Sequence, residues 1–135
     1  MKVLTAFGRK RTMMETRDIA TWVYLGPDRR RENRKVFRGP AQLQLPNREV
    51  QRVRTLDLSL GGIGIVAPSN LPKDAVCEIK FRAPLLGDRV EMLVARGRVA
   101  YSILSGKENG FLVGVQFMEI PPGALALIKR FVNPF

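Results

Sequence analysis

The sequence predicts an all-β fold, a six-stranded antiparallel β-barrel with a short C-terminal α-helix and a basic N-terminal extension. Three observations lead to this fold class. Six short segments carry strand-like apolar patterns, turn-forming residues separate them, and little helical spacing occurs between them. Parallel strands would need long crossover connections, so the strands should be antiparallel. The six segments are residues 37–45, 49–56, 63–67, 77–83, 95–103 and 111–118.

The first three segments differ in regularity. Residues 37–45 alternate apolar with polar side chains, the apolar ones being Phe37, Ala41, Leu43 and Leu45. The Gly39-Pro40 pair within this segment indicates a sheet edge or a β-bulge. Segments 49–56 and 63–67 are less regular but still favour strands, and Pro68 and Pro72 break the chain after them.

The last three segments show a period of two most clearly. Their apolar positions are Cys77, Ile79, Phe81 and Ala83 in the fourth, Ala95, Gly97, Val99, Tyr101 and Ile103 in the fifth, and Phe111, Val113, Val115 and Phe117 in the sixth. Gly87-Asp88 predicts a tight hairpin between the fourth and fifth. The stretch 105–110, which ends in Asn109-Gly110, predicts a longer hairpin loop before the sixth.

Two segments have helical rather than strand spacing. Residues 121–133 begin with two prolines and place apolar residues on roughly one face, at Leu125, Ile128, Phe131 and Val132. We expect this helix to close one mouth of the barrel. Near the N-terminus, Thr12 and Glu15 have capping-box spacing, and Ile19, Trp22 and Val23 would share one face of a second helix.

The chain is strongly basic, and the charge is concentrated at one end. It has 135 residues with a formal net charge of +11, of which residues 1–54 carry 14 Lys and Arg against 5 Asp and Glu. The density is highest in residues 29–38. Such a cluster favours an anionic, phosphate-rich ligand, whether nucleic acid, nucleotide or lipid headgroup. The alternative is a solvated basic tail that only aids solubility.

Missing residue types narrow the possible chemistry. The sequence has no histidine and one cysteine, Cys77, which excludes Ser-His-Asp and Cys-His catalysis, zinc sites built on these residues, and an intrachain disulfide. We therefore expect a protein that is not an enzyme and holds no metal. No apolar stretch reaches the length of a membrane helix, and nothing resembles a signal peptide, so a cytoplasmic protein without membrane insertion is expected. Cys77 should be a buried structural thiol.

Two motifs contain side chains suited to a guanine nucleotide. Arg30 and Arg34 form an Arg-x-x-x-Arg pair, and guanidinium groups bind phosphate oxygens, dock on the N7/O6 edge of guanine and stack on bases. Further along, Asp57 and Ser59 precede a glycine-rich stretch, residues 61–64. A carboxylate can accept hydrogen bonds from guanine N1–H and N2–H, and the glycines would permit positive φ and close approach of a ligand. Alone, this second motif also fits an ordinary glycine-rich turn.

Taken together, the motifs resemble the PilZ domain family. Arg-Arg-x-x-x-Arg at Arg29, Arg30 and Arg34 is followed 23 residues later by Asp-x-Ser-x-x-Gly, and Gly-Val-x-Phe stands near the end. The resemblance covers about residues 28–120, and the C-terminal helix also fits. The positions that carry it are Arg29, Arg30, Arg34, Asp57, Ser59, Gly62, Gly114, Val115 and Phe117.

The resemblance implies a small β-barrel that binds the bacterial second messenger cyclic di-GMP without altering it. Arg30 and Arg34 would contact phosphate and the guanine N7/O6 edge, Asp57 and Ser59 would engage a guanine, and Gly62 would keep that surface open. An arginine at the position of Arg29 is associated in the family with a stacked dimer of the dinucleotide, and Arg31 would assist. The ligand would bridge a mobile segment, 28–38, to the barrel and signal to a protein partner in motility, biofilm or exopolysaccharide control.

The resemblance also suggests domain limits and leaves alternatives open. Residues 1–27 would form an N-terminal extension and residues 28–135 the PilZ-like domain, with the barrel in 36–120 and the helix in 121–133. Arg96 and Arg98 are candidates for additional contacts, against the alternative that both are solvated arginines on the barrel exterior. The competing function is a basic β-barrel that binds nucleic acid.

Overall fold

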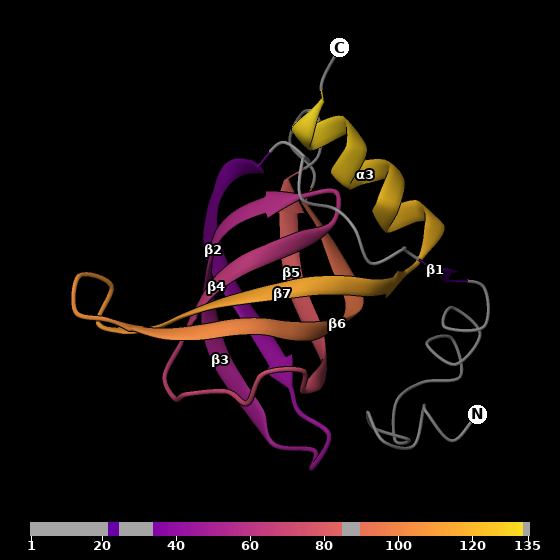
Figure 1. Cartoon of the computed structure of the whole chain (residues 1–135). Helices are drawn as coiled ribbons and strands as arrows, with labels where there is room; N and C mark the ends of the chain where they lie inside the picture. The colour runs from indigo at the N-terminus through magenta and orange to yellow at the C-terminus, as the bar shows by residue number, and fades with distance from the viewer. Residues whose placement is uncertain (1–21, 25–33, 85–89, 134–135) are drawn as a thin grey trace.

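Six long strands follow one another in the computed structural model, which describes residues 22–24, 34–84 and 90–133 (Figure 1). A two-residue strand, β1 (Val23–Tyr24), precedes them, and one helix, α3 (Pro122–Val132), follows within the described residues. The long strands are β2 (Arg34–Gln44), β3 (Val50–Ser59), β4 (Gly62–Ala67), β5 (Val76–Pro84), β6 (Val90–Ser105) and β7 (Gly110–Ile120).

The six long strands close into an antiparallel barrel. The strand order is β7-β4-β3-β2-β5-β6, and β6 pairs again with β7 to complete the ring. Two of these neighbours, β2 with β5 and β4 with β7, are far apart in the sequence. The predicted fold class, a six-stranded antiparallel β-barrel with a short C-terminal helix, is confirmed. Closure leaves no free sheet edge among these six strands over their paired lengths, which protects the barrel from edge-to-edge association.

The barrel interior is filled by the alternating apolar residues of the predicted strands. In β2, Ala41 and Leu43 are buried, and in β5 Cys77, Ile79 and Phe81 are at most 1% exposed. Full burial of a Leu, Ile or Phe side chain stabilises the fold by roughly 1.5–3 kcal/mol. The pattern in these strands therefore predicted the core correctly.

The strand pairing shifts register at four places, and two of these shifts bear on the predicted strands. In β2 the pairing with β3 shifts between Val36 and Gly39, so the bulge indicated by Gly39-Pro40 is confirmed, although β2 is an interior strand. In β6 the pairing with β7 shifts between Val99 and Tyr101. Beyond that point Tyr101 and Ile103 are 48% and 56% exposed, so their predicted inward orientation is wrong. One extra residue reverses the faces of all positions that follow it, and an alternating sequence does not reveal where it lies.

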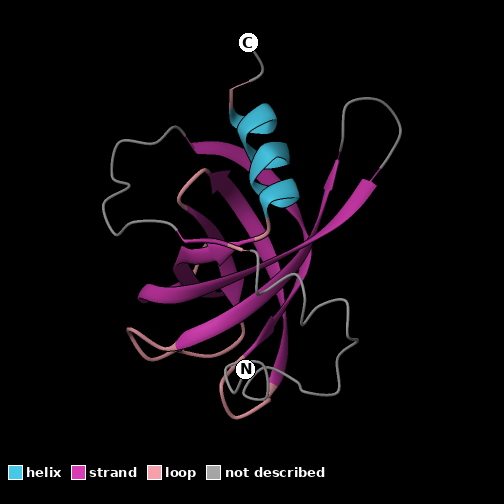
Figure 2. Ribbon diagram, turned by 90° about the vertical axis from the view of Figure 1, so that its right-hand side faces the viewer, coloured by secondary structure: helices cyan, strands magenta, loops and turns pink. Residues whose placement is uncertain are grey.

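The β6–β7 hairpin and α3 lie at different parts of the barrel. The hairpin extends beyond the barrel wall (Figure 1), and its loop, residues 106–109, is where the sequence predicted it. Helix α3 lies over one end of the barrel (Figures 1 and 2), buries Ala124, Ile128 and Val132, and packs the Phe131 ring edge-on against Phe37 at 5.5 Å. The predicted helix over 121–133 is thus found, whereas the Gly87-Asp88 turn lies outside the described residues.

The start of the described chain is a strand rather than a helix. Val23 and Tyr24 pair with Ile120 and Glu119 of β7, and Glu119 also pairs with Arg96 on the other side of β7. β1 therefore lies on the side of β7 that β4 occupies further along. Val23 does not belong to the N-terminal helix expected from residues 12–23, and residues 12–21 lie outside the described part of the chain.

The contact between α3 and the barrel should contribute measurably to stability. Ile128 lies on the buried face of α3 and is fully buried. Ile128→Ala should therefore lower the free energy of unfolding by about 2–4 kcal/mol through lost burial and a residual cavity. Lys129→Ala, an exposed neighbour on the same helix, should change it by less than about 0.5 kcal/mol. Urea unfolding followed by circular dichroism measures both, and equal losses would contradict the packing.

The buried thiol should make stability fall at alkaline pH. Desolvation by burial, with a smaller contribution from the Glu78 carboxylate, raises the pKa of Cys77 from 9.0 to about 12. Above pH 9 the unfolded chain releases this proton while the folded chain retains it, so stability decreases by about 1.4 kcal/mol per pH unit until the folded thiol also ionises near pH 12. Unfolding curves of the wild type and Cys77→Ala over this range should diverge accordingly. Parallel curves would show that the thiol is not shielded.

Candidate functional site

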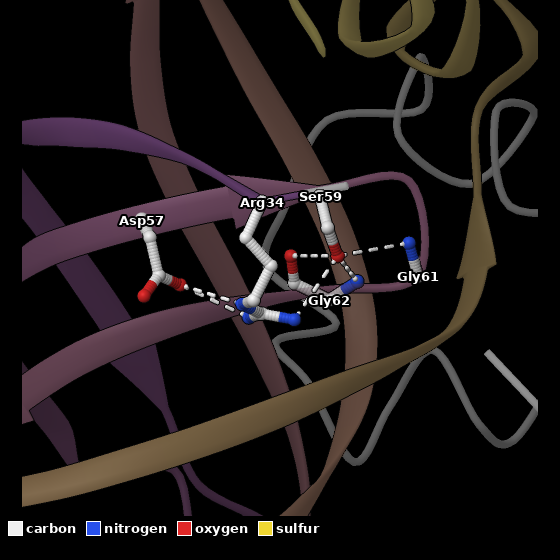
Figure 3. A network of polar contacts seen from close by, with 5 residues as sticks. All are labelled: Arg34, Asp57, Ser59, Gly61 and Gly62. Atoms are coloured by element: carbon white, nitrogen blue, oxygen red, sulfur yellow. Dashed lines mark hydrogen bonds and ion pairs between the residues drawn. The ribbon is translucent and has the colours of Figure 1, made fainter. Parts of the chain in front are cut away.

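Arg34, Asp57 and Ser59 meet where β2 begins and β3 ends. The strand register pairs Arg34 with Ser59 and Val36 with Asp57. Arg34 Nε donates a hydrogen bond to Asp57 Oδ1 at 3.1 Å, and Arg34 Nη2 lies 3.0 Å from the same oxygen. Arg34 Nη1 donates to Ser59 Oγ at 3.2 Å (Figure 3). Three predicted site residues from two distant motifs are therefore in direct contact.

The Arg34–Asp57 ion pair is accessible to solvent. The side chains of Arg34 and Asp57 are 46% and 37% exposed, and an ion pair at such a surface contributes only about 0–1 kcal/mol. Both arginine contacts use Oδ1, and among the described residues Asp57 Oδ2 makes no hydrogen bond. An incoming ligand can therefore take over either partner at small energetic cost.

Ser59, in contrast, forms its hydrogen bonds mainly within the turn between β3 and β4. It is 1% exposed, its hydroxyl accepts from the backbone N–H groups of Gly61 at 3.2 Å and Gly62 at 3.1 Å, and it donates to the Gly62 carbonyl at 3.2 Å. A hydroxyl has one proton and two lone pairs, so the Arg34 contact competes with these N–H groups. The sequence placed Ser59 against the ligand, whereas here it holds the turn and the Arg34 guanidinium.

The glycines of this motif make room for neighbouring groups of the protein itself. A Cβ on Gly62 would collide with the Val115 carbonyl oxygen of β7, and Gly62 is buried. A Cβ on Gly64 would lie 2.7 Å from Asp57 Oδ1. Neither residue has a positive φ, so the conformational freedom of glycine is not used at these two positions. Gly62 allows β4 to pack closely against β7, and Gly64 leaves space for the Asp57 carboxylate.

Tyr101 is a candidate site residue that the sequence patterns did not identify. The register places Asp57, Gly64, Gly114 and Tyr101 side by side on β3, β4, β7 and β6. Directly paired residues project from the same face of a sheet. The Tyr101 ring covers Gly114, just as the Asp57 carboxylate covers Gly64. The two adjacent glycines, both buried, thus form a floor beneath a carboxylate and a half-exposed aromatic ring, and only the β6 bulge brings that ring to this face.

The remaining predicted residues have different positions. Arg96 is 6% exposed, pairs with Glu119 and lies with its guanidinium carbon 5.8 Å from the Trp22 ring centre. It is therefore neither a solvated arginine nor an accessible ligand contact. Arg98 is exposed and lies in the row of Gln116 and Gly62, so it stays available to the site. Arg29, Arg30 and Arg31 lie outside the described residues, in the segment that leads directly to Arg34.

The third motif of the sequence is part of the barrel wall. Gly114 accommodates the Tyr101 ring, and Val115 and Phe117 are core residues at most 2% exposed. Within the described residues, no helix has the length and apolar character needed to span a bilayer.

Several solved structures are similar to this chain, and two of them are described here. The inhibitor of motility MotI/DgrA from Bacillus subtilis is 19% identical, with a TM-score of 0.67 over 80% of this chain and 52% of that chain. This chain therefore spans about half the length of the Bacillus chain. The PilZ domain with c-di-GMP of YcgR from Escherichia coli is also 19% identical, with a TM-score of 0.57 over 79% of this chain and 91% of that chain. At this identity the similarity shows a shared fold.

Sequence comparison gives a family as well as a fold. No curated protein matches the chain. The family model described as the PilZ domain matches residues 28–133, which include all six long strands and α3. With that match and the closed barrel described above, the chain belongs to the PilZ domain family.

Proposed function

We propose that this protein is a receptor that binds cyclic di-GMP at the Arg34–Asp57 site and does not alter it chemically. The observation that carries the proposal is the exposed Arg34–Asp57 pair beside the floor formed by Gly64 and Gly114. Membership of the PilZ family and the similarity to a PilZ domain described with c-di-GMP support it.

Each group around the floor matches one part of a guanine nucleotide. The Asp57 carboxylate accepts hydrogen bonds from guanine N1–H and N2–H, for which Oδ2 is available. The Arg34 guanidinium then turns to a phosphate or to the N7/O6 edge. The Tyr101 ring provides an aromatic surface on which a base stacks. Ser59 keeps the turn and Arg34 in place rather than contacting the base itself.

The arginines before β2 complete the site in this proposal. Arg29, Arg30 and Arg31 add positive charge next to Arg34, and Arg98 adds a further cation on the row of Gly62. Arg29 would favour a stacked dimer of the dinucleotide. A ligand held both by Asp57 and by these arginines joins residues 28–34 to β3, and the surface so formed signals to a protein partner.

Removing either member of the ion pair should weaken binding. Asp57→Ala and Arg34→Ala should each raise the Kd for cyclic di-GMP roughly 10- to 100-fold, since each removes charge-assisted hydrogen bonds to the ligand. Isothermal titration calorimetry measures the Kd and the stoichiometry, which separates one ligand from a stacked pair. Matched controls are Asp74→Ala and Arg130→Ala, which change exposed charges elsewhere.

Two outcomes would contradict this proposal. Wild-type protein that releases no heat with cyclic di-GMP would exclude the receptor function, and unchanged binding in both site variants would place the ligand elsewhere. Tight, salt-sensitive binding of single-stranded oligonucleotides that cyclic di-GMP does not displace would favour a nucleic-acid module. Chromatography after incubation should recover the dinucleotide intact, whereas conversion to another nucleotide would indicate an enzyme.

The Tyr101 ring should contribute by stacking. Tyr101→Ala should raise the Kd for cyclic di-GMP about 5- to 100-fold, because a base stacked on an aromatic side chain contributes about 1–3 kcal/mol. Tyr101→Trp should retain binding, and Ile103→Ala, which alters an exposed apolar residue two positions along β6, should not change it. If the alanine variant binds as well as the wild type, the ring only covers Gly114.

A further inference from the structure

A groove on the outer wall of the barrel lies apart from the Arg34–Asp57 site. It has a volume of about 480 Å³ and is lined by β3, β2, β5 and β6, at Pro40, Ala41, Gln42, Arg52, Val53, Lys80, Phe81, Arg82 and Met92. Arg52 is five residues before Asp57 on β3, which corresponds to roughly 16 Å along the strand. The groove is thus a separate feature of the same barrel.

The strand register explains why these side chains gather. Gln42 of β2 pairs with Arg52 of β3 on one side and with Lys80 of β5 on the other. Arg82 of β5 pairs with Met92 of β6. Paired residues share a face, so these side chains are on the outer surface, while Phe81 between them belongs to the core. The groove depends on the pairing of β2 with β5, two strands distant in sequence.

The groove is positively charged, and among the described residues none of those that line it is a carboxylate. Its basic lining residues are Arg52, Lys80 and Arg82. Neither Arg52 nor Arg82 makes an ion pair with any residue in the described part of the chain. Arg52 and Arg82 at one concave surface therefore attract an anion, whose binding would neutralise their charges.

The apolar part of the groove indicates what kind of anion fits. Met92 is 55% exposed, and Pro40, which lines the same groove, is also exposed. A methionine side chain is flexible and polarisable, and it adapts to apolar side chains of a partner. No exposed aromatic side chain lines the groove among the described residues, so stacking of nucleic-acid bases has no support here. An acidic peptide with an apolar anchor satisfies both the charge and the methionine.

We propose that this groove binds an acidic segment of a partner protein. Carboxylates of the segment pair with Arg52 and Arg82, and an apolar side chain of the segment packs against Met92. The site operates independently of the Arg34–Asp57 pair, so its test does not depend on the proposed receptor function.

The test uses the full chain and a defined probe. A short synthetic peptide of alternating glutamate and glycine with one central leucine is titrated into isotopically labelled protein at low salt. We expect NMR shift changes at Gln42, Arg52, Arg82 and the Met92 methyl group. Arg52→Gln with Arg82→Gln should raise the peptide Kd roughly 5- to 10-fold, because each exposed ion pair contributes a few-fold at most. A peptide with alanine in place of leucine should bind more weakly.

Matched controls and competing ligands make the test decisive. Arg48→Gln with Lys129→Gln removes the same charge from exposed positions outside the groove and should leave peptide binding unchanged. Equal loss in both double variants, or shift changes confined to residues around Arg34, would overturn the proposal. Tighter binding of an oligothymidine at these same residues would assign the groove to nucleic acid instead. Cyclic di-GMP titrated into the groove variant reports separately on the receptor site.

Discussion

The barrel depends on β7, which hydrogen-bonds to β4 along one edge and to β6 along the other. This double pairing closes the sheet, and it brings the chain so near to β4 that Gly62 has no space for a side chain. The adjacent Gly64 and Gly114 are part of the same contact. Closure therefore sets Gly64 and Gly114 side by side, with the Asp57 carboxylate over the first and the Tyr101 ring over the second.

The candidate site contains two kinds of contact, buried hydrogen bonds that hold a turn and an exposed ion pair that a ligand can replace. Ser59 is buried, and its hydrogen bonds hold the β3–β4 turn, so its energetic role is local and structural. The Arg34–Asp57 pair is exposed and contributes little to stability. A rigid turn that positions an ion pair of low stability is a suitable arrangement for binding a ligand with both anionic and donor groups. The buried Arg96–Glu119 contact, in comparison, anchors β6 to β7.

The two surfaces of the barrel differ in how charge is balanced. At the Arg34–Asp57 site the cation already has a carboxylate partner, whereas Arg52 and Arg82 in the outer groove have none among the described residues. In the two proposals, a ligand at the first site would exchange one ion pair for others, while a ligand at the second would neutralise Arg52 and Arg82. The basic residues of the sequence thus contribute to two distinct surfaces, the Arg34–Asp57 site and the outer groove.

The sequence by itself determined the local elements and most of the core. In β2, β5, β7 and α3 the spacing of the apolar residues shows directly which face of each element is buried. It also predicted that Arg34 and Asp57 serve one site. Only the tertiary structure decided that Tyr101 faces outward, that Arg96 is buried, that Ser59 holds a turn and that Arg52 and Lys80 lie on either side of Gln42. These features depend on a β-bulge and on pairing between strands that are distant in the sequence. Neither can be recognised from neighbouring residues, because contacts across the whole barrel set the register.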